Sequence, residues 1–169
     1  MNVQPITFDE AAKLVNNYHY LGKNKFMSVK RFGLFNDSLE LIGAVVYQPL
    51  AAPQSAQSAF GLPRGNYPDL LEMARLVLNP TMNGKNYGSM LIGRSLKLLK
   101  REGIRAVISY ADSTRHNGAI YQAANFGYYG LTAPKNDYLL PDGRPIQRGK
   151  TQGMGGHGCL DHESTVTFI

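Results

Sequence analysis

The sequence has one cysteine, no tryptophan and no long apolar run. A single thiol, Cys159, excludes an internal disulfide framework and a cysteine-based zinc site. No apolar stretch is long enough to span a bilayer, and residues 1–10 lack a signal pattern, so we expect a cytoplasmic protein with no membrane partner. Acidic residues are also scarce, with 12 Asp and Glu against 18 Lys and Arg. This excess favours a polyanionic partner, nucleic acid first, with a solvated basic surface as an equal alternative.

The length of 169 residues and the 43% hydrophobic content predict one domain, residues 1–169. Thr7 and Glu10 fit a capping box ahead of an amphipathic helix over residues 8–18. Two apolar runs flank residues 36–38 and predict an antiparallel hairpin. Residues 49–68 are rich in Pro, Ala, Gln, Ser and Gly and are expected to form a long loop.

The C-terminal part predicts a second hairpin over residues 137–147, an irregular glycine-rich segment over residues 148–163, and a last strand that closes the sheet. His157 and His162, with Cys159 between them and Asp161 beside them, have the chemistry of metal ligands. Their glycine-rich setting is better explained by chance composition, and we assign no metal site.

Residues 70–132 form the most informative part of the chain, because they alternate between strand and helix patterns around a glycine-containing turn. The predicted elements are a strand over 70–80 that carries Arg75, a turn over 83–89, a helix over 87–102, a strand over 106–112 and a helix over 117–126. A helix start preceded by glycines presents free backbone N–H groups and a positive dipole, which suit a phosphate. This unit therefore predicts a phosphate-bearing ligand.

The same order of elements, with AIYQAANFGYYG at its end, resembles the acyl-CoA-binding half of GNAT acetyltransferases. The resemblance implies an α/β fold with a mixed, mostly antiparallel twisted sheet flanked by helices, splayed where the ligand binds. It also implies that acetyl-CoA or another activated small-molecule donor is held at the turn by Arg75, Asn86, Gly88 and Ser89. Tyr121 would lie near the thioester sulfur as general acid. The turn departs from the family's spacing of a basic residue, two residues, Gly, one residue and Gly.

A closer resemblance covers most of the chain. YHYLGK, FGLF with LIGAVVYQ, LEMARLVL, NYGSMLIGRSLKLLK and SYADSTRHNGAIYQAANFGYYGLT are similar to the Mom-type DNA-modification proteins of phage Mu and related mobile elements. The combination is more specific than any single motif: Glu72, Arg75, Ser89, Asp112, His116, Gly118, Tyr121, Asn125, Phe126 and Gly130. The resemblance implies modification of the exocyclic amine of adenine in double-stranded DNA to carbamoylmethyl adenine, which protects phage DNA from restriction.

Asp112 ends a predicted strand, where a carboxylate can orient or deprotonate an adenine amine. The alternative is a turn or N-cap residue ahead of the next helix. Tyr121 either donates its phenol proton to a leaving group or packs as a half-buried aromatic. Ser89 either contacts the ligand or caps its helix.

Strand alternation puts Arg75 on the same face as Met73 and Val77, and on the face opposite Glu72. A charge among apolar neighbours needs a partner, which is either the ligand or another side chain. Other candidates are His19 and Tyr20 in the catalytic site, and Lys23, Lys25, Arg115 and His116 at DNA. A lone histidine is more often structural. Tyr18, Tyr20, Tyr128 and Tyr129 are candidates for stacking on a flipped adenine, although most are expected to be core or rim residues.

Three functions therefore compete: adenine modification in DNA, an ordinary GNAT N-acyltransferase acting on a small amine or protein, and a non-catalytic basic DNA-binding protein. Direct acetyl transfer to an amine gives N–CO–CH3, whereas the Mom product is N–CH2–CO–NH2. The modification therefore requires either a different donor or further chemistry after acetyl transfer.

Overall fold

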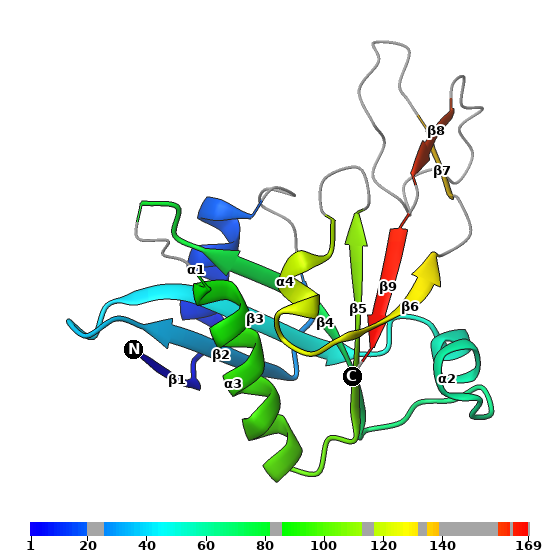
Figure 1. Cartoon of the computed structure of the whole chain (residues 1–169), viewed down its shortest axis with the longest axis horizontal. Helices are drawn as coiled ribbons and strands as arrows, with labels where there is room; N and C mark the ends of the chain where they lie inside the picture. Colours follow the sequence, from blue (N-terminus) through cyan, green and yellow to red (C-terminus); the bar gives the residue numbers. More distant parts are fainter. Residues whose placement is uncertain are drawn as a thin grey trace.

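A computed structural model describes residues 1–19, 26–81, 86–112, 117–131, 135–138, 159–162 and 164–168. The elements in chain order are β1 Asn2–Pro5, α1 Phe8–Tyr18, β2 Lys30–Phe35, β3 Leu41–Pro49, α2 Pro53–Phe60, β4 Leu70–Leu78, α3 Tyr87–Arg101, β5 Ala106–Asp112, α4 Ala119–Gln122, β6 Gly127–Leu131, β7 Lys135–Tyr138, β8 Cys159–His162 and β9 Ser164–Phe168 (Figure 1). None of the helices in these ranges is long and apolar enough to cross a membrane.

Seven strands form one sheet in the order β1-β2-β3-β4-β5-β9-β6, and β7 pairs with β8 beside it. All neighbours in the large sheet are antiparallel except β4 and β5, which run parallel. The last strand of the chain, β9, lies between β5 and β6 and completes the sheet as predicted. The predicted mixed, mostly antiparallel α/β architecture is confirmed.

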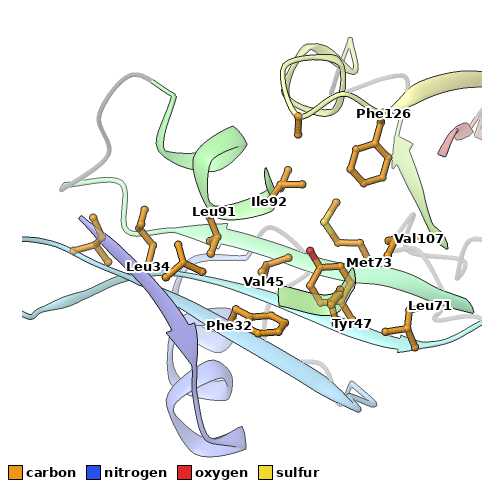
Figure 2. Packing of buried hydrophobic residues seen from close by; sticks show 14 residues of the cluster. Phe32, Leu34, Val45, Tyr47, Leu71, Met73, Leu91, Ile92, Val107 and Phe126 are labelled. Atoms are coloured by element: carbon orange, nitrogen blue, oxygen red, sulfur yellow. The ribbon is translucent and has the colours of Figure 1, made fainter. Parts of the chain in front are cut away.

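Helices cover both faces of this sheet (Figure 1). On one face, Leu91 and Ile92 of α3 pack on Phe32, Val45 and Tyr47 of the sheet (Figure 2). On the other face α1 packs through residues 11, 14 and 15 on residues 44, 46 and 77. The helix α2 lies on the same face of the sheet as α1. Its residue Ala56 packs with Leu70 and Ile108. The next residues along those strands, Leu71 and Val107, point to the α3 side, so Leu70 and Ile108 point to the α1 side.

The helix α1 begins as predicted. The Thr7 hydroxyl accepts a hydrogen bond from the backbone N–H of Glu10 (3.3 Å), and Glu10 Oε2 accepts from the backbone N–H of Thr7 (2.8 Å). These reciprocal bonds satisfy two N–H groups that have no partner inside the helix. The hairpin of β2 and β3 around residues 36–38 is confirmed as well.

Residues 49–68 are not one long loop, because Pro53–Phe60 forms α2. Pro53 takes the first helical turn and Gly61 ends the helix with a φ of 66°. A proline restricts φ to helical values at that position, and a glycine adopts the left-handed cap without strain. The Pro- and Ala-rich composition therefore encodes a short capped helix.

Two other expectations need correction. The predicted helix over residues 117–126 shortens to α4, Ala119–Gln122, because Asn125 takes a φ of 65° that right-handed helix does not allow. The strand β7 pairs with β8, which falls inside the segment predicted as irregular. The predicted partner of β7 lay within residues 139–147, which are outside the described residues.

A bulge in β4 overturns the predicted faces of Arg75 and Glu72. The register with β3 passes from Tyr47 opposite Met73 to Val46 opposite Arg75, so Ala74 is an extra residue. One extra residue reverses the alternation of side chains beyond it. Arg75 therefore shares the α1 side of the sheet with Val77 and Glu72, and Met73 lies on the α3 side.

Candidate functional site

The parallel pair of strands opens into a cleft. Pairing between β4 and β5 runs from Leu70 opposite Ala106 to Met73 opposite Ser109 and stops there. Beyond that point β4 continues beside β3 and β5 continues beside β9, so the two strands diverge. The resulting cleft has a volume of about 620 Å³. It is the splay that was predicted for the ligand.

Both faces of the sheet contribute to this cleft. Tyr18 and His19, at the end of α1, line it from one side, and Asn117–Tyr121, including most of α4, lines it from the other. The gap between the strands is therefore lined by residues from both faces of the sheet. The structure brings together three of the predicted site residues, His19, Arg75 and Tyr121, along this one cleft.

Arg75 supplies positive charge to the cleft. Its guanidinium donates a hydrogen bond from Nη1 to the carbonyl oxygen of Ala74 (2.6 Å). Within the described part of the chain Arg75 forms no ion pair with a carboxylate. A half-buried guanidinium with unused donors is suited to an anionic group of a ligand.

Glu72 and Tyr110 also line the cleft, and neither was predicted to have a role in the site. Glu72 is 9% exposed, and its carboxylate accepts hydrogen bonds from Nε2 of Gln48 (3.1 Å) and the backbone N–H of Ala51 (3.1 Å). The Tyr110 hydroxyl is 3.1 Å from Oγ of Ser55. The signal for Glu72 was a carboxylate inside the apolar run LLEMARLVL.

Tyr110 stays protonated at neutral pH. Burial raises the pKa of its phenol, and the negative charge of Glu72 adds to this, while the hydrogen bond with Ser55 acts in the opposite direction. Burial dominates because it removes water from the phenolate, the form that needs solvation most. The cleft thus holds a phenol that can donate a proton and a carboxylate that can accept one.

Tyr121 occupies the α4 wall of the cleft. Its ring meets Phe126 edge to face, with centroids 5.7 Å apart, and it packs against the main core cluster. Such a contact fixes the ring without using the hydroxyl. Tyr121 therefore packs as a half-buried aromatic and also lines the cleft, and its role as a proton donor stays a prediction.

The described part of the predicted anion turn, residues 86–89, lies at the start of α3. Asn86 is the N-cap residue in a left-handed conformation, with a φ of 67°, and it forms no side-chain cap. The Ser89 hydroxyl donates to the carbonyl oxygen of Asn86 (3.1 Å), so it caps no backbone N–H group at the helix start, and its contact with a ligand stays a prediction. Gly88 is buried against α4. What this turn can offer an anion is its first backbone N–H groups.

A second hollow runs along α3 and has a volume of about 900 Å³. It extends from Ser89 to Arg105 between α3 and residues 123–125. Its rim carries Arg94, Lys97 and Lys100, and its described lining contains no acidic side chain. An anionic tail that starts at the α3 turn would find complementary charge along this groove.

Several predicted site residues lie outside the described ranges: Tyr20, Lys23, Lys25, Arg115 and His116. For Asp112 the description covers the backbone alone, which ends β5 opposite Ser164 of β9. The position of Asp112 at the strand end is thus as predicted, and its catalytic role stays a prediction.

Known proteins resemble this chain in sequence and in fold. A model of the Mom protein family matches residues 1–155. Among curated proteins, none matches the sequence. Several solved structures are similar in fold. Arabidopsis thaliana NAA60 in complex with acetyl-CoA has a TM-score of 0.62 and 13% identity, and the match covers 99% of this chain and 97% of that chain. The ribosomal-protein-S18-alanine N-acetyltransferase from Escherichia coli has a TM-score of 0.60, 11% identity and coverages of 99% and 92%, and a Bacillus subtilis acetyltransferase in complex with CoA has a TM-score of 0.59, 14% identity and coverages of 99% and 98%. At these identities the likeness establishes the acetyltransferase fold.

Proposed function

Because the chain belongs to the Mom protein family, we propose that it modifies the exocyclic amine of adenine in double-stranded DNA. The observation that carries the proposal is the cleft between β4 and β5, which is lined from both faces of the sheet. A group transfer needs two ligands that meet at one point, and a gap lined from both faces of the sheet can bring together a donor and an acceptor held on opposite sides.

The donor is assigned to the α3 side. The backbone N–H groups at Asn86–Ser89 bind its phosphates, and the basic groove that starts at Ser89 accommodates the rest of an anionic tail. Arg75 extends from the α1 side of the sheet, so it neutralises the charge of the part of the donor that enters the gap between the strands. Acetyl-CoA fits this description, as does another activated donor that carries phosphates.

The adenine is assigned to the α1 side, where Tyr18 lines the cleft and is available for stacking. An enzyme that acts on a base inside a duplex must extrude it, and aromatic side chains stack on the extruded base. The net charge of +6 favours association with DNA. His19, Tyr20, Lys23, Lys25, Arg115 and His116 are proposed contacts to the base and the phosphates.

Asp112 orients the amine or accepts its proton, and Tyr121 protonates the leaving group. With a thioester donor, the adenine nitrogen bonds to the carbonyl carbon, the carbon–sulfur bond breaks, and the thiolate leaves with the electron pair and takes up the proton. This gives N–CO–CH3. The carbamoylmethyl product instead requires the nitrogen to bond to the methylene carbon of an acetamide unit whose leaving group departs with its electron pair. For this direct transfer the donor class is an activated carbamoylmethyl compound; with acetyl-CoA as donor, further chemistry must follow the acetyl transfer.

Mass spectrometry of nucleosides from cells that express the wild type or Asp112→Asn tests the proposal. We expect a carbamoylmethyl-type adenine with the wild type and its loss with Asp112→Asn. An unmodified adenine pool in wild-type cells would contradict the proposal.

The shared acetyltransferase fold supports one other candidate, an N-acyltransferase that acts on a small amine or protein. That enzyme would bind acyl-CoA tightly and would turn over without DNA. A non-catalytic DNA-binding protein would bind DNA in a salt-sensitive manner, unchanged by Asp112→Ala, and would leave no altered nucleoside.

A further inference from the structure

One short segment, residues 51–55, holds two polar groups of the cleft in place. The backbone N–H of Ala51 donates to Oε2 of Glu72 (3.1 Å), and Oγ of Ser55 lies 3.1 Å from the hydroxyl of Tyr110. Nε2 of Gln48 donates to the other oxygen of Glu72 (3.1 Å). Ser55 is buried, with 7% of its surface exposed, and its hydrogen bond with Tyr110 is part-buried. The carboxylate and the phenol are therefore fixed by the same piece of chain.

The two groups lie side by side on one face of the sheet. Glu72 is opposite Ile108 in the parallel pair, and Tyr110 is two residues farther along β5. Residues two apart on a strand point to the same face, so Tyr110 lies on the face of Glu72, one position past Ser109, the last residue of β5 that pairs with β4. Ile108 and Tyr110 both belong to the cluster under α2, which identifies the face as the α1 and α2 side. This is the side assigned to the adenine.

Their hydrogen-bonding capacities are complementary to each other. A carboxylate is an acceptor, while the phenol of Tyr110 has a single proton to donate. When the Ser55 hydroxyl donates to the oxygen of Tyr110, that proton is available to a ligand in the cleft. The pair then offers an acceptor next to a donor.

We propose that Glu72 and Tyr110 recognise the Watson–Crick edge of the extruded adenine, with Glu72 accepting from the 6-amino group and Tyr110 donating to ring nitrogen N1. This inference rests on the proposed function and assigns it a specificity device. Adenine presents an amine donor beside a ring acceptor, and so does cytosine. Guanine and thymine present a carbonyl acceptor beside an N–H donor, which would place donor against donor and acceptor against acceptor. The pair thus selects amino-bearing bases and rejects the other two.

Synthetic duplexes test the assignment to single atoms. The target adenine is replaced by 1-deazaadenine, which lacks the N1 acceptor, or by 7-deazaadenine, which keeps it, and kcat/KM is measured with saturating donor. For the wild type we expect 1-deazaadenine to lower kcat/KM about 10–100-fold, since a buried donor is left unpaired. We expect 7-deazaadenine to behave like adenine.

The variants separate the two roles. Tyr110→Phe should lower kcat/KM on adenine about 10–100-fold and should no longer distinguish adenine from 1-deazaadenine. Glu72→Gln should lower kcat/KM on both bases by one common factor, because its contact is to the amine. Tyr67→Phe is the matched control: Tyr67 packs in the same cluster under α2, but its hydroxyl donates to the carbonyl of Pro63 (3.0 Å), away from the cleft. The ratio of kcat/KM on adenine to kcat/KM on 1-deazaadenine should be the same for Tyr67→Phe as for the wild type.

The inference is overturned if Tyr110→Phe disfavours 1-deazaadenine as strongly as the wild type does. It is also overturned if Glu72→Gln leaves kcat/KM unchanged. A wild type that modifies no base in any duplex would instead refute the proposed function, and this inference with it. A cooperative melting curve for each variant, with its midpoint above the assay temperature, shows that the variant is folded and excludes misfolding as the cause.

Discussion

Gly88 in the first turn of α3 and Ile120 of α4 lie so close that a Cβ atom built on Gly88 would be 2.3 Å from Cδ1 of Ile120. No real side chain tolerates that separation, so one of the two must move if a methyl group is added. Ile120 and its neighbour Tyr121 both line the cleft. The absence of a side chain at Gly88 therefore leaves room for the end of the Ile120 side chain, next to Tyr121 in α4.

Replacement of Gly88 by alanine tests this contact. Alanine favours a helix over glycine by about 1 kcal/mol, but overpacking costs about 1–3 kcal/mol, so we expect Gly88→Ala to be neutral or destabilising. A methyl group added at Gly93 in the same helix would meet no described atom within 4 Å, and Gly93→Ala should stabilise by about 0.5–1 kcal/mol. Urea unfolding measures both. Ile120→Val in the Gly88→Ala background should recover stability, because it removes the methyl group that meets the added Cβ. If Gly88→Ala and Gly93→Ala raise the free energy of unfolding equally, Ile120 does not restrict the space at Gly88.

The capping box of α1 gives a second prediction. Thr7→Ala removes the acceptor of the Glu10 backbone N–H and should lower the free energy of unfolding by about 1 kcal/mol. Thr7→Ser keeps the hydroxyl and should stay within a few tenths of a kcal/mol of the wild type. The hydrogen bonds from Thr7 lower the pKa of Glu10, so their stabilisation is present above the unfolded pKa and is lost as pH falls. Thr7→Ala should therefore show a weaker loss of stability between neutral and acid pH.

The sequence predicted those elements whose signals are local. The helix α1 follows from its cap and its apolar spacing, and the hairpin of β2 and β3 follows from two apolar runs around a polar turn. The faces of β4 did not follow, because the bulge at Ala74 arises from pairing with β3, and no residue in LLEMARLVL marks it. Alternation is reliable only where the register is unbroken.

The site shows the same division. His19, Arg75 and Tyr121 were predicted from motif resemblance and do meet at one cleft. Glu72 and Tyr110 are held in the cleft by hydrogen bonds with residues 48–55, a segment predicted to be mostly loop. A carboxylate in an apolar strand signals that a partner exists, but the identity of the partner depends on tertiary structure.

Tyr47 predicts how the protein responds to alkali. Its ring is buried in the main core cluster, where its hydroxyl lies 2.7 Å from Oγ of Ser95, and burial raises the pKa of its phenol strongly (Figure 2). The folded state thus resists a deprotonation that the unfolded chain undergoes near pH 10, about the ordinary value for tyrosine. Stability should fall as pH rises above about 10, where the unfolded state binds fewer protons.

Tyr47→Phe removes this titration. Its free energy of unfolding should fall less steeply between about pH 9.5 and 11 than that of the wild type, in a series of urea titrations at about half-unit steps. At neutral pH the variant should be less stable by about 1 kcal/mol, because Ser95 loses a hydrogen-bond partner. Tyr128→Phe is the matched control, since Tyr128 is 61% exposed. Equal pH slopes for the wild type and Tyr47→Phe would contradict the prediction.

Arg75 offers the most direct test of donor binding. Its guanidinium lines the cleft and makes no ion pair among the residues the structure describes, so a bound anion gains an uncompensated positive charge. A hydrogen bond to a charged group contributes about 1.5–3 kcal/mol, and Arg75→Met should therefore weaken binding of acetyl-CoA about 10–150-fold in calorimetric titration. Arg64→Met is the control, because Arg64 is exposed and donates to Oε1 of Gln57 (3.1 Å). If Arg75→Met and the wild type bind acetyl-CoA equally, Arg75 does not contact the donor. If the wild type itself binds neither acetyl-CoA nor CoA, the donor belongs to another class of activated compound.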